Sequence, residues 1–461
     1  MLFKSINPKN GQILREAIPF FTREKLEEVI DASYDAYLEY KDVSVQERLQ
    51  RIASLRENLE KNVETYAEAL TNEMGKTLVQ ARAEVLKCAD HCKYYEENTE
   101  EVLKTKHIET AISNSYVQYQ ATGPILIISP WNFPFWMPFR TAIPQLALGN
   151  TVLYKPAPNC SLSAELLEQA MVDSGLGDAF KLLYFDTEDT EFILSNHKVQ
   201  GVGFTGSTKA GKIIASIAGK YVKKSLLELG GSDPFIVLED ADLDKAAQQG
   251  CISRLINNGQ ACINAKRFIV HEDVYDDFKV KLVDNFASKT VGDPLDESTN
   301  IGPLARDDLH ENLRQQVISA VEGGATVALG DMSRLENPAV AEEGYYFHPM
   351  VLENITEENP IYRQELFGPV ASLYKVSSLE DAVKLANDSN YGLGGAVFTE
   401  DLEKAKSVAS QIDTGMMGIN SFCISDPKLP NGGVKESGIG RECSHEGLLE
   451  FANIKSVSIP K

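Results

Sequence analysis

The chain has 461 residues, of which 43% are hydrophobic and 24% are charged. This length predicts two or three domains with a large core, and the composition is ordinary for a globular enzyme. The formal net charge of -22 opposes binding to nucleic acid or to an anionic membrane, so neither partner is expected.

The N-terminal segment 1–14 has no long apolar run, so no signal peptide is expected, and no segment is suited to a membrane span. Seven cysteines at irregular spacing favour a reduced, cytoplasmic protein. Cys88, His91 and Cys92 share a helical stretch, but no fourth zinc ligand is evident. We therefore expect packing for this trio and no metal site.

Helical patterning dominates the first hundred residues. Ser44 and Glu47 have the spacing of a capping box, and apolar residues recur at helical spacing from Leu49 to Val63. We therefore expect this whole region to be helical.

From residue 116 onward, strands are expected to alternate with helices. Gly123 and Pro124 mark a turn between the expected strands 116–120 and 125–128. Short β-branched runs predict further strands at 151–154, 182–185, 201–205, 234–238, 267–270, 370–376 and 396–399. Helices are expected at 135–147, 163–174, 208–220 and 379–387. This alternation predicts an α/β fold with mainly parallel sheets.

The closing segment 451–460 is strand-like but has no obvious partner nearby in the sequence. We expect it to pair with the strand at 116–120 or with another subunit. Domain boundaries are expected near 229, where a fresh strand follows two glycines, and near 430, after a loop-like stretch.

Six motifs follow one another along the chain: PWNFPFW (130–136), FTGSTKAG (204–211), LELGGSDP (227–234), GQACINAKR (259–267), QELFGPV (364–370) and GGVKESGIGRE (432–442). Their order and spacing resemble the aldehyde dehydrogenase superfamily over about the whole chain. The resemblance implies a Rossmann-type NAD(P)-binding domain at 1–106 and 121–229 and an α/β catalytic domain at 230–430. It also implies a small β oligomerisation arm at 107–120 and 445–461, in a homodimer or a dimer of dimers.

Cys262 resembles the family's nucleophile, although by residue type alone it could equally be a small buried side chain. Gly259 and Gln260 favour a turn that presents the thiol. A thiolate adds readily to an aldehyde, but at a pKa of about 8.5 few thiols are ionised at pH 7, so the site must promote ionisation. Asn264 stands where some relatives have a second Cys, so no local disulfide is expected there.

Glu228 is flanked by leucines, a setting that raises the pKa of a carboxyl group. The resemblance implies that it activates water to hydrolyse a thioester, in place of acyl transfer to coenzyme A. The resemblance also assigns oxyanion stabilisation to the Asn132 side chain and the Cys262 N–H. The alternatives are a salt-bridged carboxylate for Glu228 and a turn-forming role for Asn132.

The segment 201–206 matches G-x-G-x-x-G, and Glu228 follows about twenty residues later, as in dinucleotide-binding folds. A ribose role would remove Glu228 as the base, so we expect only diphosphate binding, at Gly206 and Ser207 where a helix begins. By resemblance Lys155 binds the adenosine ribose. The other cofactor contacts that the resemblance implies are Ser129, Trp131, Ala157, Pro158, Leu229, Glu365 and Phe367.

Pro158 stands where many NAD-preferring relatives carry Glu, three residues after the lysine. Without that carboxylate nothing repels a 2′-phosphate, so the cofactor is expected to be NAD or NADP, with NADP at least tolerated.

Arg140, nine residues after Trp131, is the main indication of the substrate. The surrounding motifs look most like the shorter bacterial branch of the succinate-semialdehyde dehydrogenases, where an Arg at this place binds the substrate carboxylate and a hydroxyl, here Ser425, lies near it. Some members have a second Arg at the position of Ile256, whereas this chain has Arg254 two residues earlier. The alternative for Arg140 is a surface or salt-bridged arginine.

The expected reaction is therefore the NAD(P)+-dependent oxidation of a small aldehyde, with succinate semialdehyde as the first candidate. Glutarate semialdehyde and neutral aliphatic aldehydes remain alternatives. A non-catalytic protein that retains the fold is a further alternative, although Cys262, Glu228 and Asn132 are all present.

Overall fold

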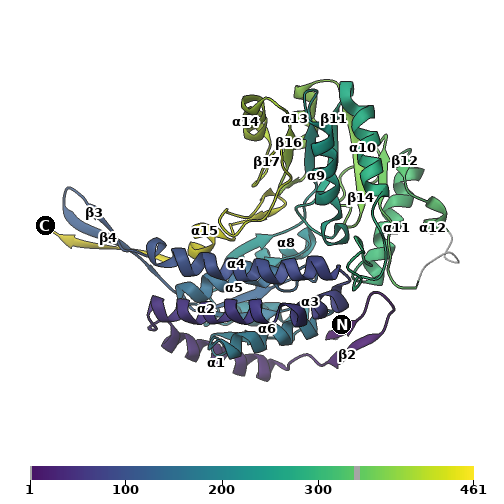
Figure 1. Ribbon diagram of the computed structural model, residues 1–461. Coiled ribbons are helices and arrows are strands. Elements are labelled where there is room, and N and C mark those ends of the chain that lie inside the picture. The colour runs from purple at the N-terminus through teal and green to yellow at the C-terminus, as the bar shows by residue number, and fades with distance from the viewer. Residues whose placement is uncertain (1–2, 337–342) are drawn as a thin grey trace.

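The computed structural model describes residues 3–336 and 343–461. Two mainly parallel sheets, each covered by helices on both faces, form the body of the molecule, and a three-stranded sheet projects from it (Figure 1). The expected α/β class with mainly parallel sheets is confirmed.

The N-terminus forms a hairpin where helix was expected. Strands β1 (Phe3–Ile6) and β2 (Ile13–Ile18) pair antiparallel. The turn between them contains Pro8 and Gly11, which has a φ of 72°, and both residues interrupt a helix. The helical prediction is correct only from Arg23 onward, in α1 (Arg23–Tyr40), α2 (Val45–Lys61), α3 (Val63–Met74) and α4 (Leu78–Val102).

The expected capping box is half formed. The Ser44 hydroxyl accepts a hydrogen bond from the Glu47 backbone N–H at 3.2 Å, which caps α2. The Glu47 carboxylate binds Arg51 at 2.7 Å instead of returning to Ser44.

A six-stranded sheet has the order β19-β9-β8-β5-β6-β7, with every pair parallel except β19 and β9. Its strands are β5 (Pro124–Ile128), β6 (Thr151–Lys155), β7 (Phe180–Leu182), β8 (Gly201–Thr205), β9 (Lys224–Glu228) and β19 (Gly438–Ile439). The order reverses between β5 and β8. In such sheets ligands bind beyond the carboxyl ends of the strands at this reversal.

Alternate residues of β5 enter two different cores, as the period of a strand requires. Ile125 and Ile127 pack with α2 to α4, α5 (Trp136–Leu148) and α6 (Ser161–Asp173). Leu126 and Ile128 pack with α1, α7 (Thr190–Ser195) and α8 (Thr208–Lys220). The sheet is therefore buried on both faces.

A seven-stranded sheet has the order β12-β13-β14-β11-β10-β16-β17, parallel except between β12 and β13. Its strands are β10 (Asp233–Val237), β11 (Ala265–His271), β12 (Thr326–Leu329), β13 (Met350–Glu353), β14 (Val370–Val376), β16 (Ala396–Phe398) and β17 (Gly418–Ile419). Helices α9 (Leu243–Leu255) and α10 (Tyr275–Ala287) cover one face. Helices α11 (Asp307–Glu322), α12 (Met332–Glu336), α13 (Leu379–Asn387) and α14 (Leu402–Gln411) cover the other.

The projecting sheet joins two distant parts of the chain. Strand β4 (Ser113–Gln120) pairs antiparallel with β3 (Lys106–Glu109) and with β20 (Asn453–Pro460). The expected pairing of the closing segment with 116–120 is thus confirmed. Short elements complete the structure: β15 (Tyr391–Gly392), β18 (Val434–Lys435) and α15 (Ser444–Leu449).

The other predicted elements lie within a few residues of the observed ones, apart from the strand expected at 182–185. That strand spans Phe180–Leu182 instead, and the chain turns away after it. Within the described ranges, no helix has the length and apolar character needed to cross a membrane.

Candidate active site

The predicted site residues gather where the two sheets face each other. Asn132 follows β5, Gly206 follows β8, and Leu229 follows β9, all at carboxyl ends of the six-stranded sheet. Cys262 instead precedes the amino end of β11 in the seven-stranded sheet. The site is therefore built from opposite ends of two sheets.

The turn expected before Cys262 is present and strained. Asn257 and Asn258 both have a φ of 57°, and Gly259 has a φ of 78°. A Cβ atom on Gly259 would lie 2.2 Å from the carbonyl carbon of Gly368, so no larger residue fits. The turn leaves the thiol of Cys262 partly buried.

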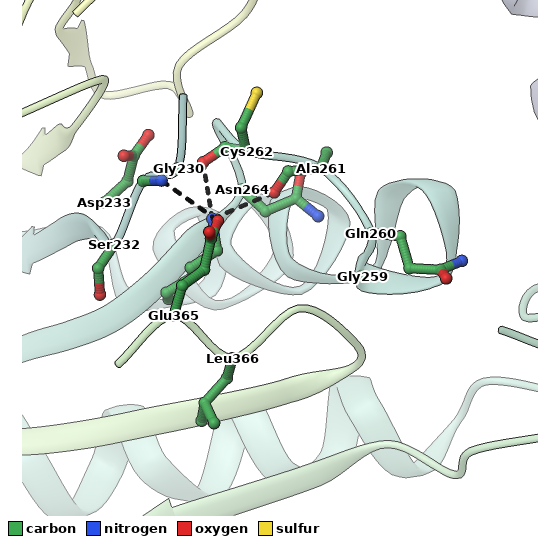
Figure 2. Close-up of polar contacts among 12 residues, drawn as sticks. Gly230, Ser232, Asp233, Gly259, Gln260, Ala261, Cys262, Asn264, Glu365 and Leu366 are labelled. Carbon is green, nitrogen blue, oxygen red and sulfur yellow. Dashed lines mark hydrogen bonds and ion pairs between the residues drawn. The ribbon is translucent and has the colours of Figure 1, made fainter. Parts of the chain in front are cut away.

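A buried lysine holds the backbone around the thiol. Lys266, 2% exposed, donates hydrogen bonds from Nζ to the carbonyl oxygens of Cys262 at 2.6 Å and Ala261 at 3.1 Å. The same Nζ forms an ion pair with Glu365 at 3.0 Å, and the Gly231 N–H donates to that carboxylate at 3.2 Å. Figure 2 shows the Cys262 sulfur directed away from Glu365 while its carbonyl oxygen faces this cluster.

Burial raises the pKa of the Cys262 thiol to about 11, although the nearby cations Arg140 and Lys266 oppose the rise. The thiol is therefore protonated at neutral pH in the free protein. The sequence analysis predicted that the site promotes ionisation of this thiol. Arg140 and Lys266 lower the thiol pKa, but not enough to offset burial.

Asn132 is fixed through both its side chain and its backbone. Its Nδ2 donates to the carbonyl oxygen of Gln260 at 3.1 Å. Its own carbonyl oxygen accepts from Lys76 at 2.9 Å and from Asn257 at 2.8 Å. Lys76 in turn pairs with Glu84, which accepts hydrogen bonds from the first N–H groups of α5. One amide hydrogen of Asn132 is left for another acceptor.

Glu228 ends β9 and is 1% exposed. Its Oε2 accepts a hydrogen bond from Asn431 at 3.1 Å, while Oε1 has no partner among the described residues. Burial, and then the nearby Glu442, raise the pKa of Glu228 to about 8 against the opposing effect of Arg140. The expected direction of the shift is confirmed. Glu228 is absent from the described lining of both cavities that hold the thiol.

Arg140 is 2% exposed and forms an ion pair with Glu442, with Nε 2.7 Å from Oε2. Glu442 also accepts a hydrogen bond from the Thr141 hydroxyl at 2.6 Å. Although burial lowers it, the pKa of Arg140 is raised overall by Glu442 and Glu228. Arg140 is thus both a salt-bridged arginine and part of the wall of a cavity beside Cys262.

We call the first cavity beside the thiol the Trp136 cavity. It brings together Cys262, Arg140 and Ser425, as the sequence led us to expect, and Ile256. The Ser425 hydroxyl is buried without a hydrogen-bond partner in the part of the chain that the structure describes. The remaining lining residues are Gln80, Ala83, Glu84, Lys87, Phe133, Trp136, Met137, Ala261, Ile263, Asn264, Phe422, Cys423 and Ile424.

Arg254 is not available to a substrate carboxylate. It is fully buried and donates to the backbone carbonyl oxygens of Val370 at 2.8 Å, Leu366 at 2.8 Å and Gly259 at 3.2 Å, and to that of Gly368. Its role is to hold the loop before Cys262 against the segment 366–370. Arg254 therefore does not replace the second arginine of some relatives.

We call the second cavity the Trp131 cavity. Trp131 and Phe367 contact edge to face across it, with ring centroids 5.7 Å apart. Its other lining residues are Pro130, Asn132, Thr205, Gly206, Ser207, Leu229, Gly230, Cys262, Leu309 and Glu365. Six of the predicted cofactor contacts thus meet around one space that reaches the thiol.

The other predicted cofactor residues lie beside this cavity. Ser129 follows β5, and Lys155 ends β6 with Ala157 and Pro158 after it. The Lys155 ammonium lies 5.2 Å and 5.5 Å from the rings of Phe3 and Phe185. Burial lowers the pKa of Lys155 to about 8, and within the described ranges no carboxylate forms an ion pair with it. An anionic ligand would fit this ammonium group.

The space and its donors suit a dinucleotide. The N-terminus of α8, capped by Ser207, offers N–H groups and a positive dipole end beside the cavity. The literal G-x-G-x-x-G match forms β8 and the turn after it. The Gly206 N–H donates a hydrogen bond to the backbone carbonyl oxygen of Glu228 at 3.0 Å, but Glu228 is not among the residues that line the cavity.

Cys88, His91 and Cys92 are buried in the core under α5. The His91 ring packs edge to face on Trp136 at 5.1 Å, and burial lowers the pKa of His91 to about 3. No cluster of three or more potential metal ligands occurs among residues 3–336 and 343–461.

Sequence reasoning missed Glu442, Lys266 and Lys87. Glu442 lies in a quoted motif, but its pairing with Arg140 joins residues about 300 positions apart. Lys266 is a charged residue at the start of an apolar strand, and this position in the sequence could have indicated a buried, functional lysine. Lys87 shares helical spacing with three other residues that line the Trp136 cavity, Gln80, Ala83 and Glu84.

Comparison with known proteins agrees with this geometry. Residues 1–457 match the model of the aldehyde dehydrogenase family. The chain is 41% identical to the succinate-semialdehyde dehydrogenase [NADP(+)] of Deinococcus radiodurans, covering 99% of this chain and 94% of the relative. It is 38% identical to the succinate semialdehyde dehydrogenase [NAD(P)+] Sad of Escherichia coli, covering 98% and 97%.

A solved structure shows the same architecture. The succinic semialdehyde dehydrogenase of Streptococcus pyogenes, in complex with NADP+, superposes with a TM-score of 0.96 at 37% identity and covers all of both chains. With the thiol at the junction of two cavities and this agreement over the full length, the chain belongs to the aldehyde dehydrogenase family.

Proposed function

We propose that this enzyme oxidises succinate semialdehyde to succinate with NADP+ or NAD+ as the oxidant. The relatives named above carry that activity in their names. The observation that carries the proposal is the Trp136 cavity, which is lined by Cys262 together with Arg140, Lys87 and the hydroxyl-bearing Ser425. A small aldehyde with a distal carboxylate matches that arrangement.

The reaction begins at sulfur. Ionised Cys262 attacks the aldehyde carbon, and the carbonyl oxygen becomes an oxyanion that accepts from the free Asn132 amide hydrogen and the Cys262 N–H. The thiol releases its proton to solvent before the attack, so Glu228 stays available for the later hydrolysis. Loss of a hydride from the same carbon then leaves a thioester on Cys262.

Hydrolysis requires Glu228 to approach the thioester. A carboxyl group with a pKa of about 8 accepts a proton from water more readily than an ordinary carboxylate. Because Oε1 has no partner and Asn431 holds only Oε2, a side-chain rotation would move the carboxylate toward Cys262. Hydroxide then displaces the sulfur, and the acid product leaves.

The bound dinucleotide would supply the hydride acceptor. Its nicotinamide and diphosphate would be held by residues around the Trp131 cavity, namely Trp131, Gly206, Ser207, Leu229, Glu365 and Phe367. Its adenosine end would be held by Ser129, Lys155, Ala157 and Pro158. Within the described ranges Lys155 forms no ion pair, although Asp186 acts on it electrostatically, and Pro158 carries no charge to repel a 2′-phosphate. We therefore propose that NADP is accepted and that Lys155 contacts its 2′-phosphate.

We also propose the domain division expected from the sequence, with the three-stranded sheet as the oligomerisation arm of a homodimer or dimer of dimers. Its exposed apolar residues support this: Ile108, Ile112, Ile454 and Ile459 are 49% to 81% exposed. All seven cysteines are free, which supports a reducing, cytoplasmic location.

Neutral aldehydes are the second candidate substrates. Apart from its few polar groups the Trp136 cavity is lined by Phe133, Met137, Phe422 and Ile424, which would accept an aliphatic chain. Glutarate semialdehyde, one methylene longer, is a further candidate.

An activity matrix tests the proposal. Initial rates would be measured for succinate semialdehyde, glutarate semialdehyde, butanal and 4-aminobutanal with each of the two cofactors. We expect the highest kcat/KM for succinate semialdehyde and activity with NADP+. A higher kcat/KM for butanal, or at least a hundredfold preference for NAD+, would contradict the corresponding half of the proposal.

A further inference from the structure

A lysine that the sequence analysis did not single out lines the Trp136 cavity. Lys87 lies on α4, is half-buried, and shares the cavity with Cys262. Its Nζ lies 4.4 Å from the centre of the Trp136 ring. This cation–π contact holds the ammonium group against the cavity wall.

Lys87 differs from the other charged residues around the cavity because it has no counter-ion in the described part of the chain. Arg140 is paired with Glu442 at 2.7 Å, and Lys76 is paired with Glu84. Within the described ranges, no carboxylate lies within 4.0 Å of the Lys87 ammonium group; Asp426 acts on it only from farther away.

The cavity therefore carries net positive charge. Glu84 is the one carboxylate among its described lining residues, and Lys76 already neutralises it. Glu228 is not among the lining residues, and burial together with Glu442 raises its pKa, which reduces its negative charge. A half-buried ammonium without a partner is costly, and a bound anion would remove that cost.

A second group in the same cavity lacks a partner. The hydroxyl of Ser425 is buried, and its side chain is 4% exposed. An ammonium and a hydroxyl together match the acceptor oxygens of one carboxylate.

We propose that Lys87 is a further specificity-determining cation of this enzyme, which binds the distal carboxylate of the aldehyde together with Ser425. Arg140, whose Nε is paired with Glu442, lines the same cavity, so Lys87 adds a second cation to the arginine expected there. This inference rests on the proposed oxidation of a carboxylated aldehyde and names the residue that selects it.

The test compares Lys87→Met, which keeps the length of the side chain and removes its charge, with Lys87→Arg, which keeps the charge. Lys93→Met is the matched control, because Lys93 is exposed on the same helix away from the cavity. Each protein is assayed with succinate semialdehyde and with butanal, and succinate is measured as a competitive inhibitor of butanal oxidation.

We expect Lys87→Met to raise KM for succinate semialdehyde about 30-fold or more, the equivalent of about 2 kcal/mol at 1.4 kcal/mol per tenfold. Succinate inhibition should weaken by a similar factor, while kcat/KM for butanal changes less than about threefold. Lys87→Arg should recover most of the affinity, and Lys93→Met should match the wild type. Retained butanal oxidation also shows that the variant is folded.

Two failures can be told apart. If the wild type does not favour succinate semialdehyde over butanal, the proposed function itself is wrong. If the wild type shows that preference but Lys87→Met keeps it, the carboxylate is bound elsewhere and the assignment of Lys87 is overturned. An equal loss for both aldehydes would also overturn it, because that result indicates a structural role.

Discussion

One lysine lies behind the Trp131 cavity and another lines the Trp136 cavity, and the two lysines are in opposite situations. Lys266, behind the Trp131 cavity, is satisfied by two carbonyl oxygens and Glu365. Lys87, in the Trp136 cavity, has an aromatic contact but no counter-ion among the residues that the structure describes. A buried charge whose partners are all within the protein serves structure, whereas one that lacks a partner is available to a ligand.

The same contrast applies to the buried arginines. Arg254 donates to four backbone carbonyl groups and fixes the turn before Cys262. Arg140 faces a cavity but is balanced by Glu442. Residue type alone does not separate these roles; the number of partners does.

The largest effect is expected for Cys262→Ala. Since both cavities share this thiol, its loss should abolish NAD(P)H formation with every aldehyde, while cofactor binding measured by fluorescence or calorimetry persists. Cys251→Ala is the control. Cys251 lies on α9, packs in the core against β11 and lines neither cavity, so this variant should stay active. Residual turnover in Cys262→Ala above a tenth of the wild-type rate would show that another group carries the chemistry.

Glu228→Gln should slow steady-state turnover by roughly 10²- to 10⁴-fold, the usual contribution of a general base. Hydride transfer should be spared more than hydrolysis, so rapid mixing should show a burst of NAD(P)H of about one per active site. Absence of a burst, with both phases slowed equally, would argue against separate roles for Cys262 and Glu228.

Much of the fold and the catalytic trio could be predicted because local sequence determines them. The strand Val370–Val376 and the helix Leu379–Asn387 follow from short-range periodicity, and both have the predicted bounds. The N-terminal hairpin could not be predicted, because Phe3 is buried only through contacts with distant residues such as Tyr184. Tertiary packing, not propensity, makes that segment a strand.

The site was predictable where motifs are contiguous and not where partners are distant. Gly259 and Gln260 predict the turn before Cys262. No residue close to Arg140 in the sequence indicates that Glu442 neutralises it. Lys87 is one charged residue among many on α4, and charged residues on a helix usually face water. Only the fold shows that this one faces a cavity.

Lys266→Met sharpens the comparison of the two lysines. Its loss would free the carbonyl groups of Ala261 and Cys262 and leave Glu365 without its counter-ion, so the nucleophile would be less well oriented. We expect kcat/KM to fall about tenfold with both succinate semialdehyde and butanal, in contrast to the selective effect of Lys87→Met. A fall in kcat/KM for succinate semialdehyde alone would contradict the proposed difference between the two lysines.

The smallest effect concerns stability and pH. The pKa of Glu228 is raised from 4.5 to about 8 in the folded protein, so the folded state holds an extra proton between these values. The stability from that proton is complete below about pH 4.5 and is lost as pH rises through about 8. Glu228→Gln should therefore gain in melting temperature relative to the wild type from pH 6 to 9. Parallel melting curves over that range would contradict the raised pKa.

The most direct test of the account is mass spectrometry of the enzyme quenched during turnover of succinate semialdehyde, with Glu228→Gln used to accumulate the intermediate. We expect one added acyl group, carried by the peptide that contains Cys262. An acyl group on another residue, or unmodified protein during the NAD(P)H burst, would contradict it.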